Sequence, residues 1–220
     1  MYAEDTALLA QGKTPSQALT TLEAWLIPWK IKLNVDKTKA ILFFKQNNDW
    51  PKINIYDTPV DWKNEVKYLG VVLDKNFTFK SRTNHPRGKF NKSLRAQYSL
   101  ICRNSSFSIV NSTLIYLTYL RPILAYASPI WGCTSKSNLT QIQAMENKTL
   151  RMIRDARWYH RNEEIRTALK TPSLAKFIRK LSDKFFFDLL KARNASFAKI
   201  PNYDPTYPCN IKRPRYSLTL

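Results

Sequence analysis

Two groups of lysine and arginine residues have the types and spacing of side chains that bind phosphates. Cationic groups that follow a nucleic-acid backbone neutralise its charge and release counterions, which favours binding. The first group consists of Lys80, Arg82, Arg87, Lys89, Lys92 and Arg95. The second consists of Arg151, Arg154, Arg157 and Arg161. Its spacing of three or four residues predicts that Arg151, Arg154 and Arg157 lie along one side of a helix. Both groups are therefore candidate nucleic-acid-binding surfaces.

Two aromatic residues, Trp158 and Tyr159, lie inside the second group. Their rings could stack on bases, as aromatic side chains do in proteins that bind single strands, or they could pack in the core. The sequence leaves both interpretations open. His160, which follows them, has no neighbouring acid or thiol that would argue for catalysis, and it is assigned no role.

The positive charge of the chain is concentrated in two blocks. The 220 residues include 36 basic and 16 acidic side chains, for a net charge of +20 at pH 7. Residues 61–103 hold ten basic and three acidic residues, and residues 151–220 hold sixteen basic and six acidic ones. A self-repelling excess of this size predicts a polyanionic partner, and nucleic acid is favoured over a membrane surface because no basic segment carries an apolar anchor face. The alternative from another class is a helical interaction protein whose positive charge matches an acidic protein partner.

Several kinds of site and segment are excluded. The four glycines cannot form a glycine-rich phosphate loop, so no small-molecule cofactor is evident. The three cysteines and two histidines are not at the spacing of zinc ligands. No secretory signal begins the chain, and its most apolar stretch, residues 114–132, is broken by Arg121, Pro122 and Pro129. We therefore expect an intracellular protein, in the nucleus or cytoplasm, with reduced cysteines and no membrane segment.

Residues 1–75 carry the patterns of a small antiparallel sheet with one helix. Thr14 and Pro15 have the types that begin helices, and the apolar spacing that follows predicts a helix over about 15–31, which Pro28 kinks or ends. The first ten residues predict a short hairpin with Glu4 and Asp5 at its turn. Compact apolar segments between Pro and Asp residues predict buried strands at 39–44, 53–56 and 66–73.

Downstream of Asp74 the apolar period changes to three or four residues, which predicts helices. One helix is marked by Phe90 to Ile101, and Pro86 should limit how far upstream it runs. The others are predicted at 108–120 and 123–131, broken at Arg121-Pro122, at 139–153, and from an N-cap at Ser173 to Leu189. The fold class is therefore α+β, with the sheet first and a basic helical bundle after it.

Several segments, in this order, resemble the reverse transcriptases of non-LTR retrotransposons of the jockey type. Tyr2-Ala3-Glu4-Asp5-Thr6 resembles the YADD motif of these enzymes, and Val66 to Val71 with Leu73-Asp74 resembles their primer-grip segment. The remaining similar segments are Trp29 to Asn34 with Asp36 to Phe43, Tyr119 to Tyr126, Ile130 to Gly132, and Gln143 to Ile153. The resemblance covers nearly the whole chain and implies an RNA-directed DNA polymerase, a nucleotidyltransferase.

The resemblance also implies a division of the chain into domains. Residues 1–78 correspond to the C-terminal part of the palm, here a truncated palm made of the small sheet and one helix. Residues 79–198 correspond to a helical thumb and connection region, and residues 199–220 form a Pro-rich basic tail. The partners implied are RNA and DNA as template and primer.

The catalytic and grip residues implied by the resemblance lie in residues 1–78. Glu4 and Asp5 would be the catalytic carboxylates that bind Mg²⁺ in the complete enzyme, although the family has aspartate where Glu4 stands. A longer side chain shifts the carboxylate, and Mg²⁺ tolerates little change in ligand geometry. Lys37 would lie near the nucleotide triphosphate, unless it is only a solvated loop residue. Tyr68, Leu69 and Gly70 would form the hairpin that holds the primer end, and an ordinary buried strand is the alternative.

We expect this chain alone to be inactive as a polymerase. It begins one residue before Tyr2, whereas the family's other essential aspartate and its fingers lie upstream of that motif. Two metal ions need carboxylates that converge on one point, so the fragment alone is expected to bind no Mg²⁺. The alternative is a non-catalytic nucleic-acid-binding module derived from such an element.

Overall fold

The computed structural model describes residues 32–43, 52–56, 58–132 and 134–191, together with residues 7, 20, 24, 26–28 and 30. It divides into two compact units, residues 1–78 and 79–220, each of which is described by itself. The expected hairpin at 1–10, most of the expected helix at 15–31 and the tail at 199–220 lie outside the described residues. Strands in the first unit and helices in the second confirm the α+β class.

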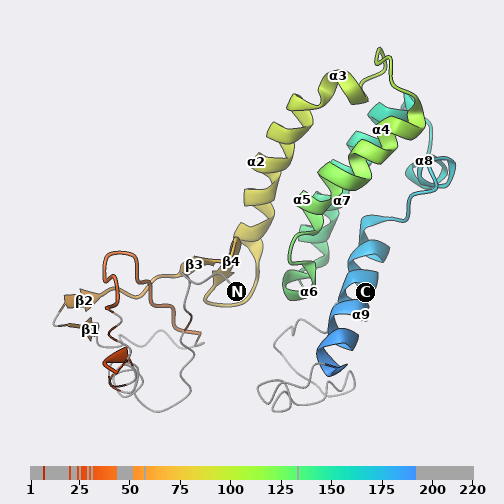
Figure 1. The fold of residues 1–220 in the computed structure, drawn as a ribbon. Coiled ribbons are helices and arrows are strands. Elements are labelled where there is room, and N and C mark those ends of the chain that lie inside the picture. The colour runs from red at the N-terminus through yellow and green to blue at the C-terminus, as the bar shows by residue number, and fades with distance from the viewer. Residues whose placement is uncertain are drawn as a thin grey trace. The chain divides into compact units, whose positions relative to one another are not determined.

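The described residues of the first unit form two antiparallel hairpins, which do not pair with each other as one sheet (Figure 1). β1 (Ile53–Ile55) pairs with β2 (Thr58–Val60), and β3 (Glu65–Tyr68) pairs with β4 (Val71–Asp74). The expected strand at 39–44 is wrong over its described part, because residues 41–43 belong to no strand and only Ala40 forms a bridge, to Trp62. Phe43 instead stacks on Phe77 at 4.3 Å between ring centroids.

The chain reverses at Leu69-Gly70, which confirms the hairpin that the resemblance implied at residues 68–70. The alternative of a single strand over 66–73 is therefore wrong. Both residues have positive φ, 46° at Leu69 and 78° at Gly70, as in the two-residue turns that match the twist of a hairpin. Tyr68 and Val71 are therefore partners across the hairpin. The apolar run on both sides of the turn hid this reversal, since a run of this kind is equally typical of one continuous buried strand.

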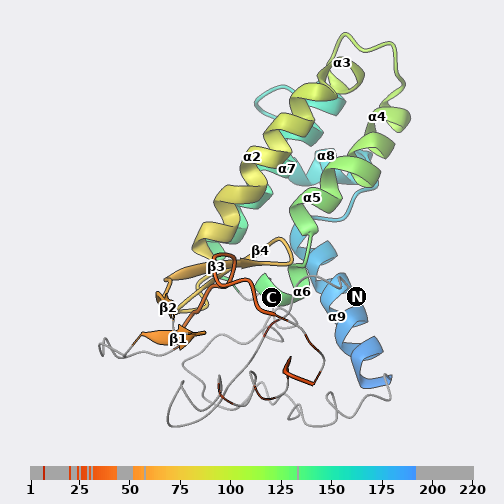
Figure 2. The same ribbon diagram turned by 60° about the vertical axis from the view of Figure 1, so that its left-hand side comes forward.

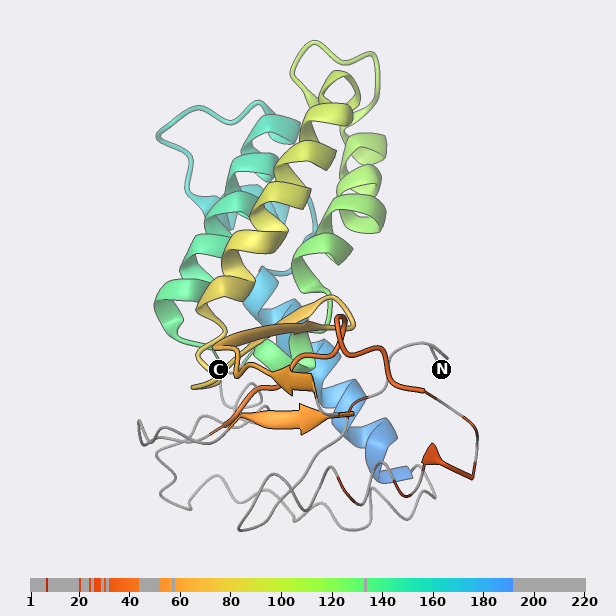
Figure 3. The same cartoon turned by 90° about the vertical axis from the view of Figure 1, so that its left-hand side faces the viewer.

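The second unit is a bundle of helices. α2 contacts α5 and α7, and Figure 3 shows α2 (yellow) between α4 (green) and α7 (teal). Figure 2 shows α3 at one end of the bundle and α6 at the other, where α6 contacts α9. The helices are α2 (Lys80–Ala96), α3 (Tyr98–Ile101), α4 (Ile109–Ile115), α5 (Arg121–Ala125), α6 (Ser128–Trp131), α7 (Lys136–Arg154), α8 (Asn162–Ala168) and α9 (Leu174–Lys191), with a π-helical turn, η1, at Tyr116–Leu120.

Neither of the expected proline breaks occurs where the sequence placed it. The helical path continues through Arg121-Pro122 because η1 widens the backbone just before the proline, and the Arg121 amide donates to the Tyr116 carbonyl five residues back. Pro122 then occupies the first turn of α5, where a missing amide hydrogen costs little. The break comes instead at Tyr126-Ala127, before α6. α2 likewise runs through Pro86, which is itself buried, so packing offsets the lost hydrogen bond.

Three serine caps fix where the other long helices begin. The Ser108 side chain accepts a hydrogen bond from the backbone amide of Asn111 at the start of α4, and the Ser135 side chain accepts one from the backbone amide of Asn138 at the start of α7. The expected cap at Ser173 is confirmed, because its Oγ accepts from the Lys176 amide at 3.4 Å. The apolar core of this unit has as fully buried members Phe90, Ile101, Tyr116, Leu120, Leu124, Trp131, Ile142, Leu150, Leu174 and Ile178.

Candidate nucleic-acid interface

The outer side of α2 presents a row of cations. At about 3.6 residues per turn, Lys89, Lys92 and Arg95 follow one another on the side opposite the buried Phe90 and Leu94. All three side chains are exposed, and so is that of Arg87. Lys80 and Arg82 lie in the first turns of α2, where the structure describes only the backbone. The predicted first group is thus brought onto one helix, and its last three members form what we call the α2 row.

The second predicted group is divided by the end of α7. The helix ends at Arg154, and Asp155 adopts a left-handed conformation with φ 52°. Arg157 therefore lies beyond the helix, and the expectation that it shares one helical side with Arg151 and Arg154 is wrong. The side chains of Arg154, Arg157 and Arg161 are exposed and remain candidates for phosphate binding.

Arg151 holds the segment that connects α7 to α8. Its Nε donates to Asn162 Oδ1 at 2.9 Å, and its terminal nitrogens donate to the carbonyl oxygens of Arg157 and His160 at 3.0 and 2.5 Å. All three nitrogens of the planar guanidinium are thus used inside the protein, an arrangement that lysine cannot reproduce. The geometry gives Arg151 a structural role that its place in the sequence pattern did not indicate.

Residues 155–161, the α7–α8 loop, carry exposed aromatic rings. Trp158 is 89% exposed and Tyr159 is 56% exposed, so the interpretation that they pack in the core is wrong. The two rings meet edge to face at 5.8 Å between centroids. Figure 3 shows this loop (teal) projecting from the end of α7.

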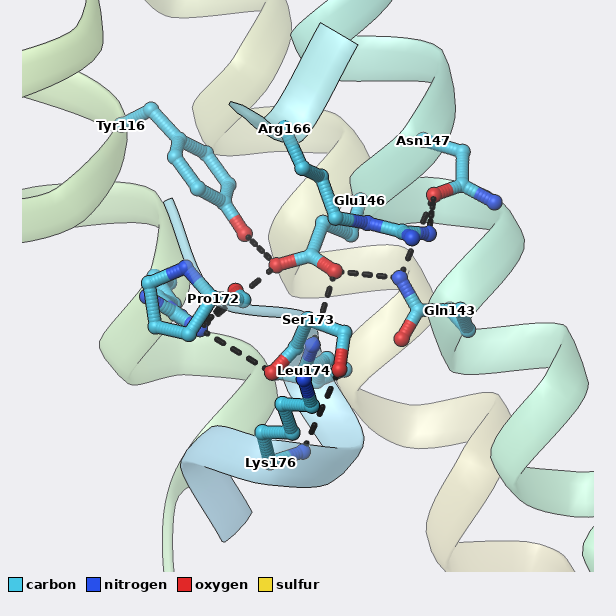
Figure 4. A network of polar contacts seen from close by, with 10 residues as sticks. Tyr116, Gln143, Glu146, Asn147, Arg166, Pro172, Ser173, Leu174 and Lys176 are labelled. Atoms are coloured by element: carbon cyan, nitrogen blue, oxygen red, sulfur yellow. Dashed lines mark hydrogen bonds and ion pairs between the residues drawn. The ribbon is translucent and has the colours of Figure 1, made fainter. Parts of the chain in front are cut away.

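A buried polar network lies among η1, α5, α7 and the start of α9 and was not anticipated from the sequence (Figure 4). The carboxylate of Glu146 is fully buried; it accepts from Tyr116 Oη at 2.6 Å and from the Leu174 amide at 3.0 Å, and Gln143 also contacts it. Burial, the Glu146 charge and this hydrogen bond raise the pKa of Tyr116, so its hydroxyl stays protonated and donates. Glu146 thereby joins the start of α9 to α7.

Arg121 is the cation of this network. It lies 3.9 Å from Glu146, donates to the Pro172 carbonyl at 2.8 Å, and stands 4.0 Å from the centre of the Phe177 ring. The sequence did contain a signal for the pair, because Glu146 is the one acidic residue in 104–150 and falls at helical spacing between Ile142 and Leu150. An acid on an apolar helix face needs a buried partner, and Arg121 is the one arginine in the same span.

The structure describes only some of the expected palm residues of the first unit. Glu4 and Asp5 lie outside the described residues, and no cluster of potential metal ligands occurs among the described ones. Lys37 is exposed on a turn, with its amide bonded to Asn34 Oδ1 at 3.1 Å. Tyr68 is half-buried, whereas Leu69 and Gly70 form an exposed hairpin tip.

The Leu69-Gly70 turn gives a first testable prediction. Gly70→Ala should destabilise the β3–β4 hairpin by about 1–2 kcal/mol, because a Cβ is disfavoured at positive φ. Leu69→Asn should do the opposite, since Asn-Gly is the preferred pair for this turn. Hydrogen exchange of the β3 and β4 amides should become about tenfold faster in the first variant and slower in the second. Equal exchange rates of these amides in the two variants would contradict a turn with positive φ at both residues.

Known proteins resemble this chain along most of its length. The probable RNA-directed DNA polymerase from transposon X-element of Drosophila melanogaster is 30% identical over 195 residues, which cover 89% of this chain and 22% of that protein. The RNA-directed DNA polymerase from mobile element jockey of the same species is 28% identical over 216 residues, or 93% of this chain and 24% of that protein. The chain is related to the jockey-type RNA-directed DNA polymerases.

This relationship confirms the resemblance to jockey-type reverse transcriptases that the motifs indicated. The probable polymerase from transposon BS extends it to all of this chain, at 27% identity. The chain spans only between 22% and 25% of the length of these jockey-type relatives. No protein-family model and no solved structure matches it. Within the described part of the chain, no helix has the length and apolarity needed to cross a membrane.

Proposed function

We propose that this chain is the C-terminal part of an RNA-directed DNA polymerase of a non-LTR retrotransposon and that its helical unit is the thumb, which holds template and primer. The observation that carries the proposal is the α2 row, three exposed cations at successive turns of one helix in a chain related to jockey-type polymerases. Its spacing suits a phosphate backbone. Arg87, Arg154, Arg157 and Arg161 would add further phosphate contacts.

The hairpin of the first unit supports a grip role in the same complex. Leu69 keeps a backbone conformation that is unfavourable for leucine, at an exposed tip. Strain of this kind commonly marks residues that contact a ligand. Residues 68–70 would contact the primer end, and Lys37, on its turn, would lie near the incoming nucleotide.

The polymerase activity itself would need more than this chain. Glu4 and Asp5 would contribute two carboxylates to a Mg²⁺ site whose other ligands come from a different part of the polymerase, and Mg²⁺ would supply the activation of the primer hydroxyl. Purified chain should therefore incorporate no nucleotide on a primed RNA template. Steady incorporation that disappears with Glu4→Ala would show that the chain is a complete enzyme and would overturn this part of the proposal.

Binding to nucleic acid is tested by the salt dependence of affinity. The dissociation constant for a fluorescent RNA/DNA hybrid should rise steeply with salt, with a log-log slope of the association constant steeper than about −4, because each neutralised phosphate contributes about 0.9. Fluorescence anisotropy between low and moderate salt measures this slope. A flat slope, or no binding at low salt, would contradict the thumb-like role. The chain could also bind with that slope and yet add nothing to polymerisation when it is combined with the rest of a polymerase. That outcome would favour a non-catalytic binding module.

A further inference from the structure

The α7–α8 loop combines an exposed aromatic ring with exposed cations. Trp158 is more exposed than any other large hydrophobic side chain in the described part of the chain. Arg154, Arg157 and Arg161, which lie within four residues of it along the chain, are exposed as well. A large ring in water is a feature that binding can stabilise by covering it. The cations beside it indicate that its ligand is anionic.

The loop is held in place by bonds to its surroundings. Arg151 donates to two of its carbonyl oxygens, at Arg157 and His160, as described above. Asp155 pairs with Arg103 at 3.0 Å. At the far end, the Arg161 amide donates to Glu164 Oε2 at 3.2 Å, which joins the loop to the first turn of α8. Exposure of the rings is therefore a property of an anchored loop, and an anchored loop loses little conformational entropy when it binds.

The chemistry of the loop selects among anionic ligands. An aromatic ring offers a flat face, which matches a nucleobase, and the guanidinium groups match the flanking phosphates. Bases inside a duplex already stack on one another and present no free face, whereas unpaired bases do. An acidic protein would match the arginines, but it would have no particular use for the Trp158 ring.

We propose that the α7–α8 loop binds a single-stranded stretch of nucleic acid, with an unpaired base stacked on Trp158 and adjacent phosphates on Arg154, Arg157 and Arg161. Tyr159, which meets Trp158 edge to face, supports the orientation of the indole. Arg151 is a positioning residue that contacts the loop and not the ligand. This inference rests on the proposed nucleic-acid binding and adds the class of strand that this end of the bundle recognises.

The test compares two ligands that differ only in pairing. Affinities of the full chain are measured for a labelled single-stranded oligonucleotide and for the blunt duplex of the same sequence. Trp158→Ala should weaken single-strand binding about five- to 150-fold, the range expected for loss of one stacked base, and should leave duplex binding nearly unchanged. Trp158→Phe, which keeps a flat ring, should restore most of the affinity.

Two further variants separate stacking from other effects. Phe187→Ala removes an aromatic ring of α9 that is 57% exposed, and should change neither affinity. Arg151→Lys keeps the charge but not the forked hydrogen bonds, so it should reproduce the selective loss seen with Trp158→Ala. Equal effects of Trp158→Ala on both ligands, or no effect on either, would overturn the inference while leaving the proposed function intact. Failure of the unmodified chain to bind either ligand would overturn both.

Discussion

Glu146→Ala is expected to lower the free energy of unfolding by about 3–5 kcal/mol, the range observed when one partner of a buried ion pair is removed. The variant leaves Arg121 buried with its charge uncompensated, and it also removes the acceptor of Tyr116 and of the Leu174 amide. Urea unfolding of the full chain, followed by circular dichroism, measures the change. The urea concentration at the midpoint of unfolding should fall, because the network stabilises the helical unit.

Controls on the same network separate the loss of charge from the loss of shape. Glu146→Gln also leaves Arg121 without a counter-charge but keeps an oxygen that can accept from Tyr116, so it should cost about 1 kcal/mol less than Glu146→Ala. A double variant, Glu146→Leu with Arg121→Met, removes both charges and should be more stable than Glu146→Ala, since an apolar pair needs no charge compensation. The cycle is completed by the single variants Glu146→Leu and Arg121→Met. If the double variant loses as much stability as these two lose together, then the two charges are not coupled.

Neutralising the α2 row is expected to lower the affinity for an RNA/DNA hybrid by about two orders of magnitude at 0.1 M salt. Lys89→Gln, Lys92→Gln and Arg95→Gln together remove three phosphate contacts, each of which contributes about 0.9 to the slope against salt. The slope should therefore become shallower by about 2.7. Circular dichroism should show an unchanged fold, because all three side chains are exposed.

α9 offers a matched control for this variant. Lys176, Lys180 and Lys184 are three exposed lysines at intervals of four residues, so glutamine at each of them makes the same change in net charge. The α9 variant should retain most of the affinity and most of the salt slope. Equal losses in the two variants would show that binding follows net charge alone and that α2 is not a specific contact surface.

The sequence predicted the fold class and the long helices, because their apolar spacing and serine caps are local signals. α7 and the start of α9 at Ser173 follow from such signals. Prediction from the sequence failed where a contact between distant residues, or an unusual backbone conformation, determined the local structure. Pro122 is accommodated by a π-helical turn that no spacing rule anticipates. At Leu69-Gly70 the apolar pattern on both sides favoured one strand, and only the resemblance to the primer-grip segment indicated the hairpin.

The candidate site was predicted as a set of residues but not as an arrangement. The α2 row follows from helical spacing, since its three cations and the apolar residues opposite them lie on one regular helix. Arg151 could not be assigned from its type, because only the fold brings the Arg157 and His160 carbonyls to its guanidinium. The exposure of Trp158 was equally hidden, since a tryptophan in a sequence is as compatible with a core as with a surface.

The π-helical turn at Tyr116–Leu120 absorbs one extra residue without changing the direction of the helix that follows. It contains one residue more than an α-helix would use for the same path. Loss of a single residue there would close the wide turn into a regular α-helix, and the later side chains would keep their direction around the axis, so that Arg121 would still face Glu146. Pro122 would then stand in a helix interior, where its ring clashes with the carbonyl four residues back. The number of residues in this segment therefore decides whether the helix can accept the proline.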